Sequence, residues 1–593
     1  MRISRIQVQN FRNLANVDFR TGDGVVIVGE NKSGKSNLLH AVRLVLDPSL
    51  SDRDRRLDLN DFWDGLEPKI GSVIEVLVDI IDFEASPILL AHLGDFLIEP
   101  GPPMVARLGY RYQPKANLEG PPTTVADYEV VLFGGAGEQM VPSRLRLSLP
   151  LDVHGALRDA ARDLGTWRKS PLRPLVERLE GQLDAGVTTD VLNRMTKAQD
   201  DFKAQAAVSG VADQITDRLV AMAGAKHGTL LALGLASFKR ETLLRELELL
   251  IDGGLRDVSH ASSGTANLIF FALKTLELDL LVDEGSRDHT FLGVEEPEAH
   301  LHPHVQRLIY RYLLGQAEAA HGGVANKITP ILTTHSPHIA SVAPIRSIVL
   351  MRRAGNGSCT AFSTATAPLS DRDAKDLQRY IDVTRGELFF ARGVVLVEGD
   401  AEKFLIPAYA DVLGIDLDAL GITVASVAGT NFLPYVKLLG ANALNIPYVI
   451  LTDMDTQDGD KPPRAKNRVK GLLTHAHPGP DYDGMDQGAI FGAANQAGYF
   501  VNSETLEIDL FRNGLGAGIR RVITEELGLS AAGQATIQGW IDDLDTLDED
   551  KLLKVIERVG KGRLAQGIAT DVTAANCPAY IHSALERIRD AVA

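Results

Sequence analysis

Cysteine is scarce in this sequence, which has only Cys359 and Cys577 among its 593 residues. Two cysteines cannot form the disulfide framework of a small secreted protein or the thiolate cluster of a structural zinc site. A reducing compartment fits this composition, so we expect a cytoplasmic protein.

Long apolar runs and an excess of positive charge are also missing. A membrane-spanning helix requires about 18 consecutive apolar residues, and no segment of the sequence reaches that length. We therefore expect no membrane partner. The N-terminal MRISRIQVQNFRNL alternates and carries charges throughout, which predicts a strand of the folded protein and not a signal peptide. The net charge of −17 excludes a uniformly basic surface, so nucleic-acid binding has to be argued from particular sites.

The chain is too long for one hydrophobic core, and its patterning changes several times along its length. Alternating segments predict an α/β domain over 1–152, with antiparallel strands continuing through VPSRLRLSL at 141–149. Apolar residues then recur every three or four positions, which predicts a helical insert over 153–235. Strand and helix alternate again over 236–370, and a second α/β pattern with a helical C-terminal part occupies 385–593.

Residues 29–36, GENKSGKS, match the phosphate-loop pattern G-x-x-x-x-G-K-[ST]. An apolar strand (VVIV) precedes the loop and an apolar helix (NLLHAV) follows it, which is the context that the pattern needs. Backbone N–H groups of such a loop surround phosphate oxygens, and the helix N-terminus adds the positive end of its dipole. Lys35 is expected to reach the β- and γ-phosphates, and Ser36 to bind Mg²⁺. The expected ATP-binding residues are Asn31, Lys32, Ser33, Gly34, Lys35, Ser36 and Asn37.

Three later segments carry polar groups that suit an ATPase site. Glu295 and Glu296 end the apolar run FLGV, and we assign the first to the metal and the second to the catalytic base. His335 follows the strand KITPIL, where it can sense a γ-phosphate, and Ser262 and Gly264 begin an apolar helix. Taken singly, residues of these kinds are more often a solvated strand end, a structural histidine and a helix cap. Their order along the chain gives them weight.

In this order the four segments resemble the ATP-binding-cassette ATPases of the SMC and RecF type, and EEPEAHLHP at 295–303 is especially close. The resemblance implies that Ser262 and Gly264 of one chain close over a nucleotide held by another, with His335 as the switch histidine. The sequence ASSGT at 261–265 departs from the family signature LSGGQ.

The helical insert interrupts this ATPase without adding a nucleotide motif. Its apolar positions recur at helical spacing and must be buried, either within the chain or against a second chain. The family resemblance favours the second chain, and therefore a dimerisation arm. The positions concerned are Leu172, Leu175, Val176, Leu179 and Leu183.

A second site is indicated where two apolar strands end in carboxylates. The strand VVLV ends in Glu398, with Glu402 one helical turn later, and the strand YVILT ends in Asp453 and Asp455. Residues two apart on an extended strand share a face, and parallel strands bring their carboxyl ends to one sheet edge. Several carboxylates in one place need a cation, and hard oxygen ligands select Mg²⁺ or Mn²⁺.

These motifs match the Toprim pattern of topoisomerases, primases and RecR-like nucleases. Further along, Glu504 and Glu507 in ETLEID are both candidates for a second metal position. Lys561 in VGKGR can stabilise a pentavalent phosphate, and with Glu398 it completes the expected catalytic set.

An ATPase followed by a Toprim domain resembles the overcoming lysogenization defect (OLD) family, which includes the ATPase–nuclease subunit of the Gabija anti-phage system. The resemblance extends over nearly the whole chain. It implies an ATP-regulated DNA endonuclease that uses two Mg²⁺ or Mn²⁺ ions, assembles as a homodimer or larger homo-oligomer through the insert, and acts in anti-phage defence or DNA processing. Some members of the family work with a UvrD-like helicase and others work alone.

Three other functions share parts of this pattern. An ATP-dependent DNA clamp of the RecF or SMC type would carry a non-cleaving Toprim module, but a binding module needs no chelating carboxylates. A topoisomerase needs a nucleophilic tyrosine, and Tyr409, Tyr435 and Tyr499 lack a recognisable context. A primase would need a zinc-binding module, for which the sequence has no candidate.

Overall fold

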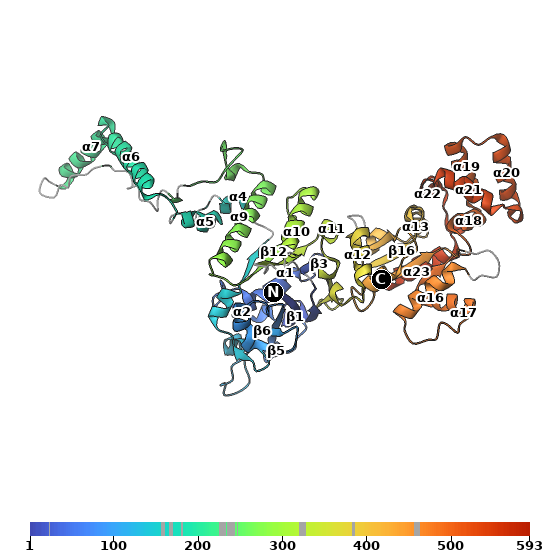
Figure 1. Cartoon of the computed structure of the whole chain (residues 1–593), viewed down its shortest axis with the longest axis horizontal. Coiled ribbons are helices and arrows are strands. Elements are labelled where there is room, and N and C mark those ends of the chain that lie inside the picture. Colours follow the sequence, from blue (N-terminus) through green and yellow to red (C-terminus); the bar gives the residue numbers. More distant parts are fainter. Residues whose placement is uncertain are drawn as a thin grey trace. The chain divides into compact units, whose positions relative to one another are not determined.

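A computed structural model describes most of the chain. The described residues are 1–22, 24–155, 160–164, 166, 170–179, 182–223, 233, 244–245, 247–318, 328–381, 386–455 and 463–593. The chain divides into two compact units, and Figure 1 follows it through both. The first unit comprises Met1–His154, Asp288–Glu298 and Pro303–Ala593, and the second comprises Gly155–Arg287 and Ala299–His302.

The first unit begins with an antiparallel sheet. Along β1, Ile6 and Val8 are buried while Gln7 and Gln9 are not, which is the alternation expected of a strand with one face on a core. Among the described residues the sheet has seven strands, in the order β2 (Leu14–Arg20), β1 (Arg2–Phe11), β4 (Ile74–Ile81), β6 (Val105–Pro114), β7 (Tyr128–Gly134) and β8 (Gln139–Met140), with β5 (Leu97–Glu99) paired to β6.

The second sheet of this unit is mainly parallel and carries the phosphate loop. Its central strands β3 and β13 are buried along their whole length, as expected for a sheet covered on both faces. Helix α1 (Lys35–Leu46) follows β3, and α10 (Pro303–Glu318) packs against β13. The strand order is β15 (Cys359–Ser363), β14 (Ile348–Arg353), β3 (Val25–Gly29), β13 (Ile328–Thr334), β12 (Thr290–Glu295) and β9 (Leu151–His154), with only the β14–β15 pair antiparallel.

The strand predicted at 141–149 is wrong, because the structure has helix α3 (Ser143–Ser148) there. The leucines alternate in sequence, but Leu145 and Leu149 are buried and Leu147 is 58% exposed. A spacing of four places the two buried leucines on one face of a helical turn. Three alternating leucines are therefore compatible with either element, and burial decides for the helix.

The second unit is mainly helical, as predicted for the insert. Val176 is buried, Leu172 and Leu175 are half-buried, and Leu179 and Leu183 are 40% and 38% exposed. Residues 224–232 and 234–235 of the predicted insert, including its C-terminal boundary, lie outside the described residues. The elements are α4 (Ala160–Leu164), α5 (Leu172–Leu179), α6 (Ala185–Lys203), α7 (Ala206–Ala223), β10 (Leu250–Ile251), β11 (Arg256–Asp257) and α9 (Ser263–Asp283).

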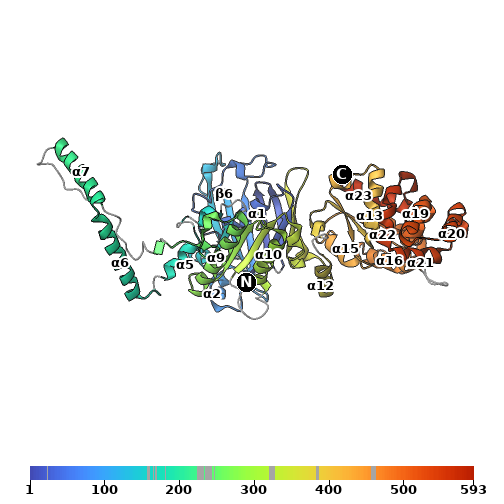
Figure 2. The ribbon, with the colours of Figure 1, turned by 90° about the horizontal axis from the view of Figure 1, so that it is seen from above.

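The C-terminal part of the first unit contains a four-stranded parallel sheet, in the order β17 (Ile422–Ser426), β16 (Gly393–Val397), β18 (Tyr448–Thr452) and β19 (Tyr499–Val501). Helix α23 (Ala579–Val592) packs on β16 and β18, and α13 (Asp400–Val412) lies beside α22 (Lys561–Ile568) in both views (Figure 1, Figure 2). The remaining helices include α16 (Arg464–Ala476), α17 (Gln487–Ala497), α18 (Leu506–Leu510), α19 (Gly516–Leu527), α20 (Ala531–Asp542) and α21 (Glu549–Val559).

The predicted α/β class is confirmed, with an interrupted N-terminal α/β domain and a second α/β domain after it. The four predicted domain boundaries stay predictions. Within the described ranges, every helix is too short or too polar to cross a bilayer.

Candidate active sites

The phosphate loop joins β3 to α1 at the carboxyl edge of the parallel sheet. Lys32 and Gly34 have positive φ values of 65° and 94°, which turn the chain tightly before the helix. Gly34 is the N-cap of α1 and provides no side-chain cap, so the first N–H groups of the helix are left for another acceptor. A cavity of about 360 Å³ lies over the loop, lined by residues 31–37 together with Asn13, Glu296 and His335.

Lys35 is folded back onto the loop that it belongs to. Its Nζ donates to the carbonyl oxygens of Gly29 at 2.9 Å and Glu30 at 3.0 Å, and lies 3.4 Å from His335 Nδ1. Burial lowers the pKa of Lys35 to about 8, although the Glu296 and Glu298 carboxylates act in the opposite direction. The lysine is thus held ready at the loop, at a desolvation cost that phosphate oxygens would offset.

His335 connects this lysine to the predicted base. Its Nε2 lies 3.2 Å from Glu296 Oε1, and Glu296 has a left-handed backbone with φ of 45°. Burial lowers the pKa of His335, and the nearby Lys35 charge lowers it further. Lys35, His335 and Glu296 therefore lie in one chain of contacts, as the sequence predicted. Glu295 is the last residue of β12, and Ser36 is exposed beside the loop.

Glu298 also contributes to this site, although the sequence reasoning missed it. Its Oε1 accepts hydrogen bonds from Thr334 Oγ1 at 2.6 Å and from the backbone N–H of His335 at 2.9 Å, while the Tyr310 hydroxyl donates to Oε2. Glu298 thereby fixes the loop that carries the histidine. The available indication was the third acidic residue of EEPE, placed close behind the assigned pair.

The residues of the loop fit a nucleoside triphosphate. Among the described residues, the buried Ser33 hydroxyl is one of few side-chain groups without a hydrogen-bond partner, and it lies inside the loop. The uncapped helix start adds further free donors. Unpaired donors and a lysine around a cavity are what anionic oxygens require.

Ser262 and Gly264 lie in the second unit, at the start of α9. The Ser262 hydroxyl accepts a hydrogen bond from the backbone N–H of Thr265 at 3.2 Å, so it caps the helix. A Cβ on Gly264 would lie 2.8 Å from the carbonyl oxygen of His300, so the position needs a glycine to bring these segments together. Their action on a nucleotide in another chain stays a prediction.

The second site forms where β16 and β18 end side by side. The two strands are parallel and paired, so Glu398 and Asp453 follow them at the same edge of the sheet. Glu398 Oε1 accepts hydrogen bonds from the backbone N–H of Asp453 at 2.9 Å and from the Thr452 hydroxyl. The parallel pairing of β16 and β18 therefore brings these carboxylates together, as predicted.

Asp453 is the most perturbed carboxyl of this edge. Its Oδ1 accepts hydrogen bonds from the backbone N–H of Leu506 at 3.1 Å and from the side-chain amide of Asn502. Burial, together with the neighbouring Glu398 and Glu402 charges, raises the pKa of Asp453 to about 8. Burial also raises the pKa of Glu402, which is 9% exposed. The carboxyls are therefore too close and too dry to ionise together without added positive charge.

Arg468 supplies part of that charge, and the sequence reasoning missed it. Its Nη1 lies 2.9 Å from Glu398 Oε1 and 2.9 Å from the carbonyl oxygen of Asp453, and its Nη2 donates to Asp455 Oδ2. Helix α16 buries Ala465, Val469, Leu472 and Leu473, and this packing presents Arg468 to the strand ends. In the sequence the arginine belongs to the basic run RAKNRVK, which is typical of a solvated helix face.

Glu507 and Lys561 complete the cluster from the helical part. Glu507 is 3% exposed, and Lys561 Nζ lies 3.1 Å from its carboxylate. Burial lowers the pKa of Lys561, but the interactions with Glu507, Asp453 and Glu402 together outweigh it, and the net shift is upward. Glu504 turns instead to Glu549, and burial together with that neighbour raises the pKa of Glu504 to about 7. Of the two glutamates that the sequence left open, Glu507 is the one that shares the cluster.

The donor atoms at this edge suit a hard divalent cation, because they are carboxylate oxygens. Within the part of the chain that the structure describes, however, no three Asp, Glu, His or Cys side chains form a group that could hold an ion as they stand. Arg468 lies between Glu398 and Asp455, and Lys561 pairs with Glu507. The chemistry therefore fits a divalent ion, for which Arg468 has to release Glu398 and Asp455.

Comparisons with known proteins agree with both sites. Residues 389–455 match the family described as overcoming lysogenization defect protein-like, TOPRIM domain, and residues 1–87 and 186–340 match the AAA ATPase domain. The OLD nuclease of Thermus scotoductus is 26% identical over 496 residues, which cover 79% of this chain and 85% of that protein. Endonuclease GajA of Bacillus cereus is 21% identical over 498 residues, 80% of this chain and 78% of that protein.

A solved structure is similar to the C-terminal part. The C-terminal region of the Burkholderia pseudomallei OLD protein is 53% identical over 34% of this chain and 100% of that structure, with a TM-score of 0.32. The two family matches confirm the predicted ATPase and Toprim domains, and with them the use of a nucleotide and of divalent metal in general. The roles assigned to single residues stay predictions.

Proposed function

This chain belongs to the overcoming lysogenization defect (OLD) family, and on that premise we propose that it is a metal-dependent DNA endonuclease controlled by ATP. One observation carries the proposal: the paired ends of β16 and β18 place Glu398, Asp453 and Asp455 at one sheet edge, next to Lys561. The relatives named OLD nuclease and endonuclease GajA support the same activity.

The acidic residues of the cluster would hold Mg²⁺ or Mn²⁺, in our proposal two ions. Bound divalent ions supply an activated water and stabilise the leaving oxygen when a phosphodiester is cleaved. Lys561 is anchored by Glu507 and half-exposed, so its ammonium group can face a DNA phosphate and stabilise the negative charge that develops there. The proposed ligands are Glu398, Glu402, Asp453, Asp455 and Glu507.

The phosphate loop would bind ATP, with Lys35 facing the phosphates and Ser36 and Glu295 facing the accompanying Mg²⁺. Glu296 would act as the base that prepares water for hydrolysis, and the contact between His335 and Glu296 supports a histidine that senses the γ-phosphate. Ser262 and Gly264 of a second chain would close the site. This arrangement requires a homodimer or larger homo-oligomer, for which we propose the helical insert as the contact.

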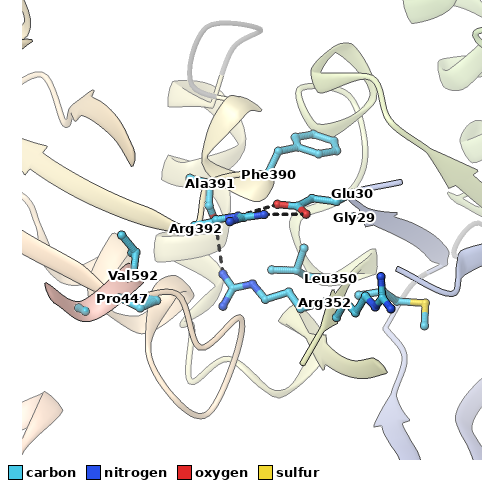
Figure 3. Close-up of a pocket in the computed structure, with 12 residues that line it drawn as sticks. Gly29, Glu30, Leu350, Arg352, Phe390, Ala391, Arg392, Pro447 and Val592 are labelled. Atoms are coloured by element: carbon cyan, nitrogen blue, oxygen red, sulfur yellow. Dashed lines mark hydrogen bonds and ion pairs between the residues drawn. The ribbon is translucent and has the colours of Figure 1, made fainter. Parts of the chain in front are cut away.

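Control of cleavage by ATP is supported by contacts that join the phosphate loop to the second α/β domain (Figure 3). Arg392 Nε and Nη2 lie 2.9 and 3.2 Å from the two carboxylate oxygens of Glu30, a residue of the loop. Arg352 of β14 donates to the carbonyl oxygens of Asn445 at 2.8 Å and Ala391 at 3.3 Å. Burial lowers the pKa of Arg352, and the negative charge of Glu30 opposes this shift.

These contacts hold the amino ends of the strands whose carboxyl ends carry the acidic cluster. Arg392 directly precedes β16, and Asn445 lies shortly before β18. A cavity of about 340 Å³ beside them, lined by Gly29, Glu30, Arg352 and Arg392 among others, leaves room for the loop to shift (Figure 3). We propose that a nucleotide on the loop alters the position of β16 and β18 and thereby the acidic cluster.

Anti-phage defence is the biological role that we propose, from the resemblance to the Gabija subunit. A UvrD-like helicase is a proposed partner on the same ground. Pull-down of the tagged full-length protein from its own cells, followed by mass spectrometry, tests the helicase directly. Recovery of the chain without a helicase would place it among the family members that work alone.

A plasmid-nicking assay in Mn²⁺ tests the nuclease. We expect Asp455→Asn to lose cleavage, because the change removes a charged oxygen from the cluster. Asp411→Asn, at an exposed position of α13, is the matched control and should cleave like the unaltered protein. Cleavage by Asp455→Asn at the unaltered rate would refute the assignment.

A non-cleaving DNA clamp is the second candidate, because Arg468 lies among the carboxylates and a binding module could keep it there permanently. The same assay separates the two functions. A clamp would retain plasmid in a gel-shift experiment with ATP and leave it uncut at every metal concentration.

A further inference from the structure

Arg468 has little exposure to solvent and is surrounded by hydrogen-bond acceptors. Its side chain is 11% exposed, and its guanidinium lies between Glu398 Oε1 and Asp455 Oδ2, with the Thr452 hydroxyl and the Asp453 carbonyl as further acceptors. A guanidinium keeps its charge at all accessible pH values, so this group is a permanent cation at the centre of the acidic cluster.

The surroundings of Arg468 are strongly acidic. Glu398 and Asp455 contact it directly, and the half-buried Asp453 and the buried Glu402 add their carboxyl groups close to Glu398. Another basic group of the cluster, Lys561, is paired with Glu507. Without Arg468, the carboxylates of the two strand ends would have no cationic side chain between them, and their repulsion would act on the folded chain.

The same oxygens cannot serve a guanidinium and a metal ion together. Glu398 Oε1 and Asp455 Oδ2 are occupied by Arg468, and both residues belong to the donor set proposed for the ions. A divalent ion that takes these oxygens must therefore displace the arginine. Because Arg468 comes from α16, a separate element from the strands that carry the carboxylates, it can withdraw without disturbing them.

We propose that Arg468 is the internal counter-ion of the nuclease site: it holds Glu398 and Asp455 in place before metal binds and competes with the incoming divalent ion for their oxygens. The inference rests on the proposed metal-dependent function and deepens it. Arg468 is a positioning residue, since it acts through the two carboxylates. Its removal should strengthen metal binding, whereas loss of an ordinary supporting residue weakens it.

Titration of the nucleotide-free full-length protein with Mn²⁺ in a calorimeter tests the proposal. We expect Arg468→Met to bind Mn²⁺ about 10-fold more tightly, the size of effect that one neighbouring charge has on the proton affinity of a carboxyl group. In EDTA the same variant should unfold at a lower temperature than the unaltered protein, and added Mn²⁺ should raise that temperature by more.

Two further variants serve as controls for the loss of charge at Arg468. Arg464→Met removes the same charge from an exposed position one turn earlier on α16, so its Mn²⁺ affinity should stay within about twofold of the unaltered protein. Arg468→Lys keeps the charge and loses the fork that bridges two carboxylates, so it should bind Mn²⁺ slightly more tightly. If Arg468→Met does not fold, the Mn²⁺ affinity of Arg468→Lys tests the proposal in its place.

The outcomes separate this inference from the function on which it rests. Equal or weaker Mn²⁺ binding by Arg468→Met, or weaker binding by Arg468→Lys, overturns the counter-ion role and leaves the metal site standing. Mn²⁺ binding that Asp455→Asn does not reduce overturns the metal site itself, and the counter-ion role with it.

Discussion

The phosphate loop and the acidic cluster both hold a basic side chain against the groups that would meet a ligand, but they hold it differently. Lys35 donates to backbone carbonyls of its own loop, which leaves the side chains around the cavity unblocked. Arg468 is held by two of the proposed metal ligands themselves. The first site is therefore assembled before its ligand arrives, whereas the second has to exchange one cation for another.

The two sites share their construction at the sheet edge. In each, the residue that carries a functional carboxylate stands just past a parallel strand and has a left-handed backbone, with φ of 45° at Glu296 and 49° at Asp455. Such a backbone is costly for a residue other than glycine, so it persists where its surroundings enforce it. The difference between the sites thus lies in the cation and its partners, and not in the strands that present the acids.

Removal of Lys35 is the strongest test of whether the sites are separate. Lys35→Ala should weaken ATP binding by about 100-fold, in the range for removing one partner of a buried charge pair. Mn²⁺ binding at the acidic cluster should stay unchanged, because that cluster uses different carboxylates. Fluorescent-nucleotide binding and Mn²⁺ calorimetry on the same preparation measure both. Loss of Mn²⁺ binding in this variant would contradict the two-site description.

Both sites could be located from the sequence because their motifs lie on contiguous residues. The loop at 29–36 and the strand ends at Glu398 and Asp453 each join an apolar strand to a recognisable polar end. Parallel pairing of β16 and β18 then brings the acids together without further information. This is why the α/β class and the convergence of these residues could be predicted, while their roles stay predictions.

The residues that sequence reasoning missed act across long sequence separations. Arg468 meets Glu398 from 70 positions away, and Arg392 meets Glu30 from 362 positions away. Each lies in a stretch that resembles an ordinary surface, so only the packing of α16, or of the two α/β domains, identifies its partner. The error at 141–149 has a different cause, since alternating leucines fit a strand and a helical turn alike.

Removal of Lys561 tests which groups of the acidic cluster act on the reaction and which bind the metal. Lys561→Ala should slow nicking by about 100-fold, as the loss of one transition-state donor does. Its Mn²⁺ affinity should change far less than its cleavage rate, because the lysine pairs with Glu507 and is not a ligand. A single experiment that records both quantities separates the roles. A parallel fall in affinity and rate would show that Lys561 serves metal binding instead.

The pH dependence of nucleotide binding offers a further contrast, because the amine of a lysine can lose its proton whereas a guanidinium keeps its charge. Burial lowers the pKa of Lys35 to about 8, so the loop keeps its positive charge below that pH and loses it above. ATP affinity should therefore fall above pH 8, by at most about 10-fold per pH unit for a single titrating group. Lys35→Arg, which stays charged, should give a flat profile. A decline of equal slope in Lys35→Arg would assign the titration to another group.

The lowered pKa of Lys35 also has a consequence for stability. Between pH 8 and the ordinary pKa of a lysine, the unfolded chain binds more protons than the folded one, so the free energy of unfolding rises with pH in that window. Lys35→Met should remove this rise in urea denaturation at pH 8 and pH 10. The same comparison on Arg468→Met should keep the rise, because this variant retains Lys35.

The smallest effect is expected at the contact between the two sites, where Arg392 meets Glu30. This pair is 58% and 56% exposed, and exposed pairs contribute about 0.2–1 kcal/mol, or about 1.5- to fivefold in an equilibrium. Arg392→Ala should therefore reduce the change in nicking rate that ATP causes by a factor in that range. Nicking without nucleotide should stay as it is, because Arg392 touches no proposed ligand.

Arg5→Ala is the matched control, since Arg5 makes a similar two-bond pair with Asp18, at 2.8 and 2.6 Å, away from both sites. If both variants respond to ATP like the unaltered protein, the loop does not act on the acidic cluster through this pair, and the contacts of Arg352 with Ala391 and Asn445 are the next to test.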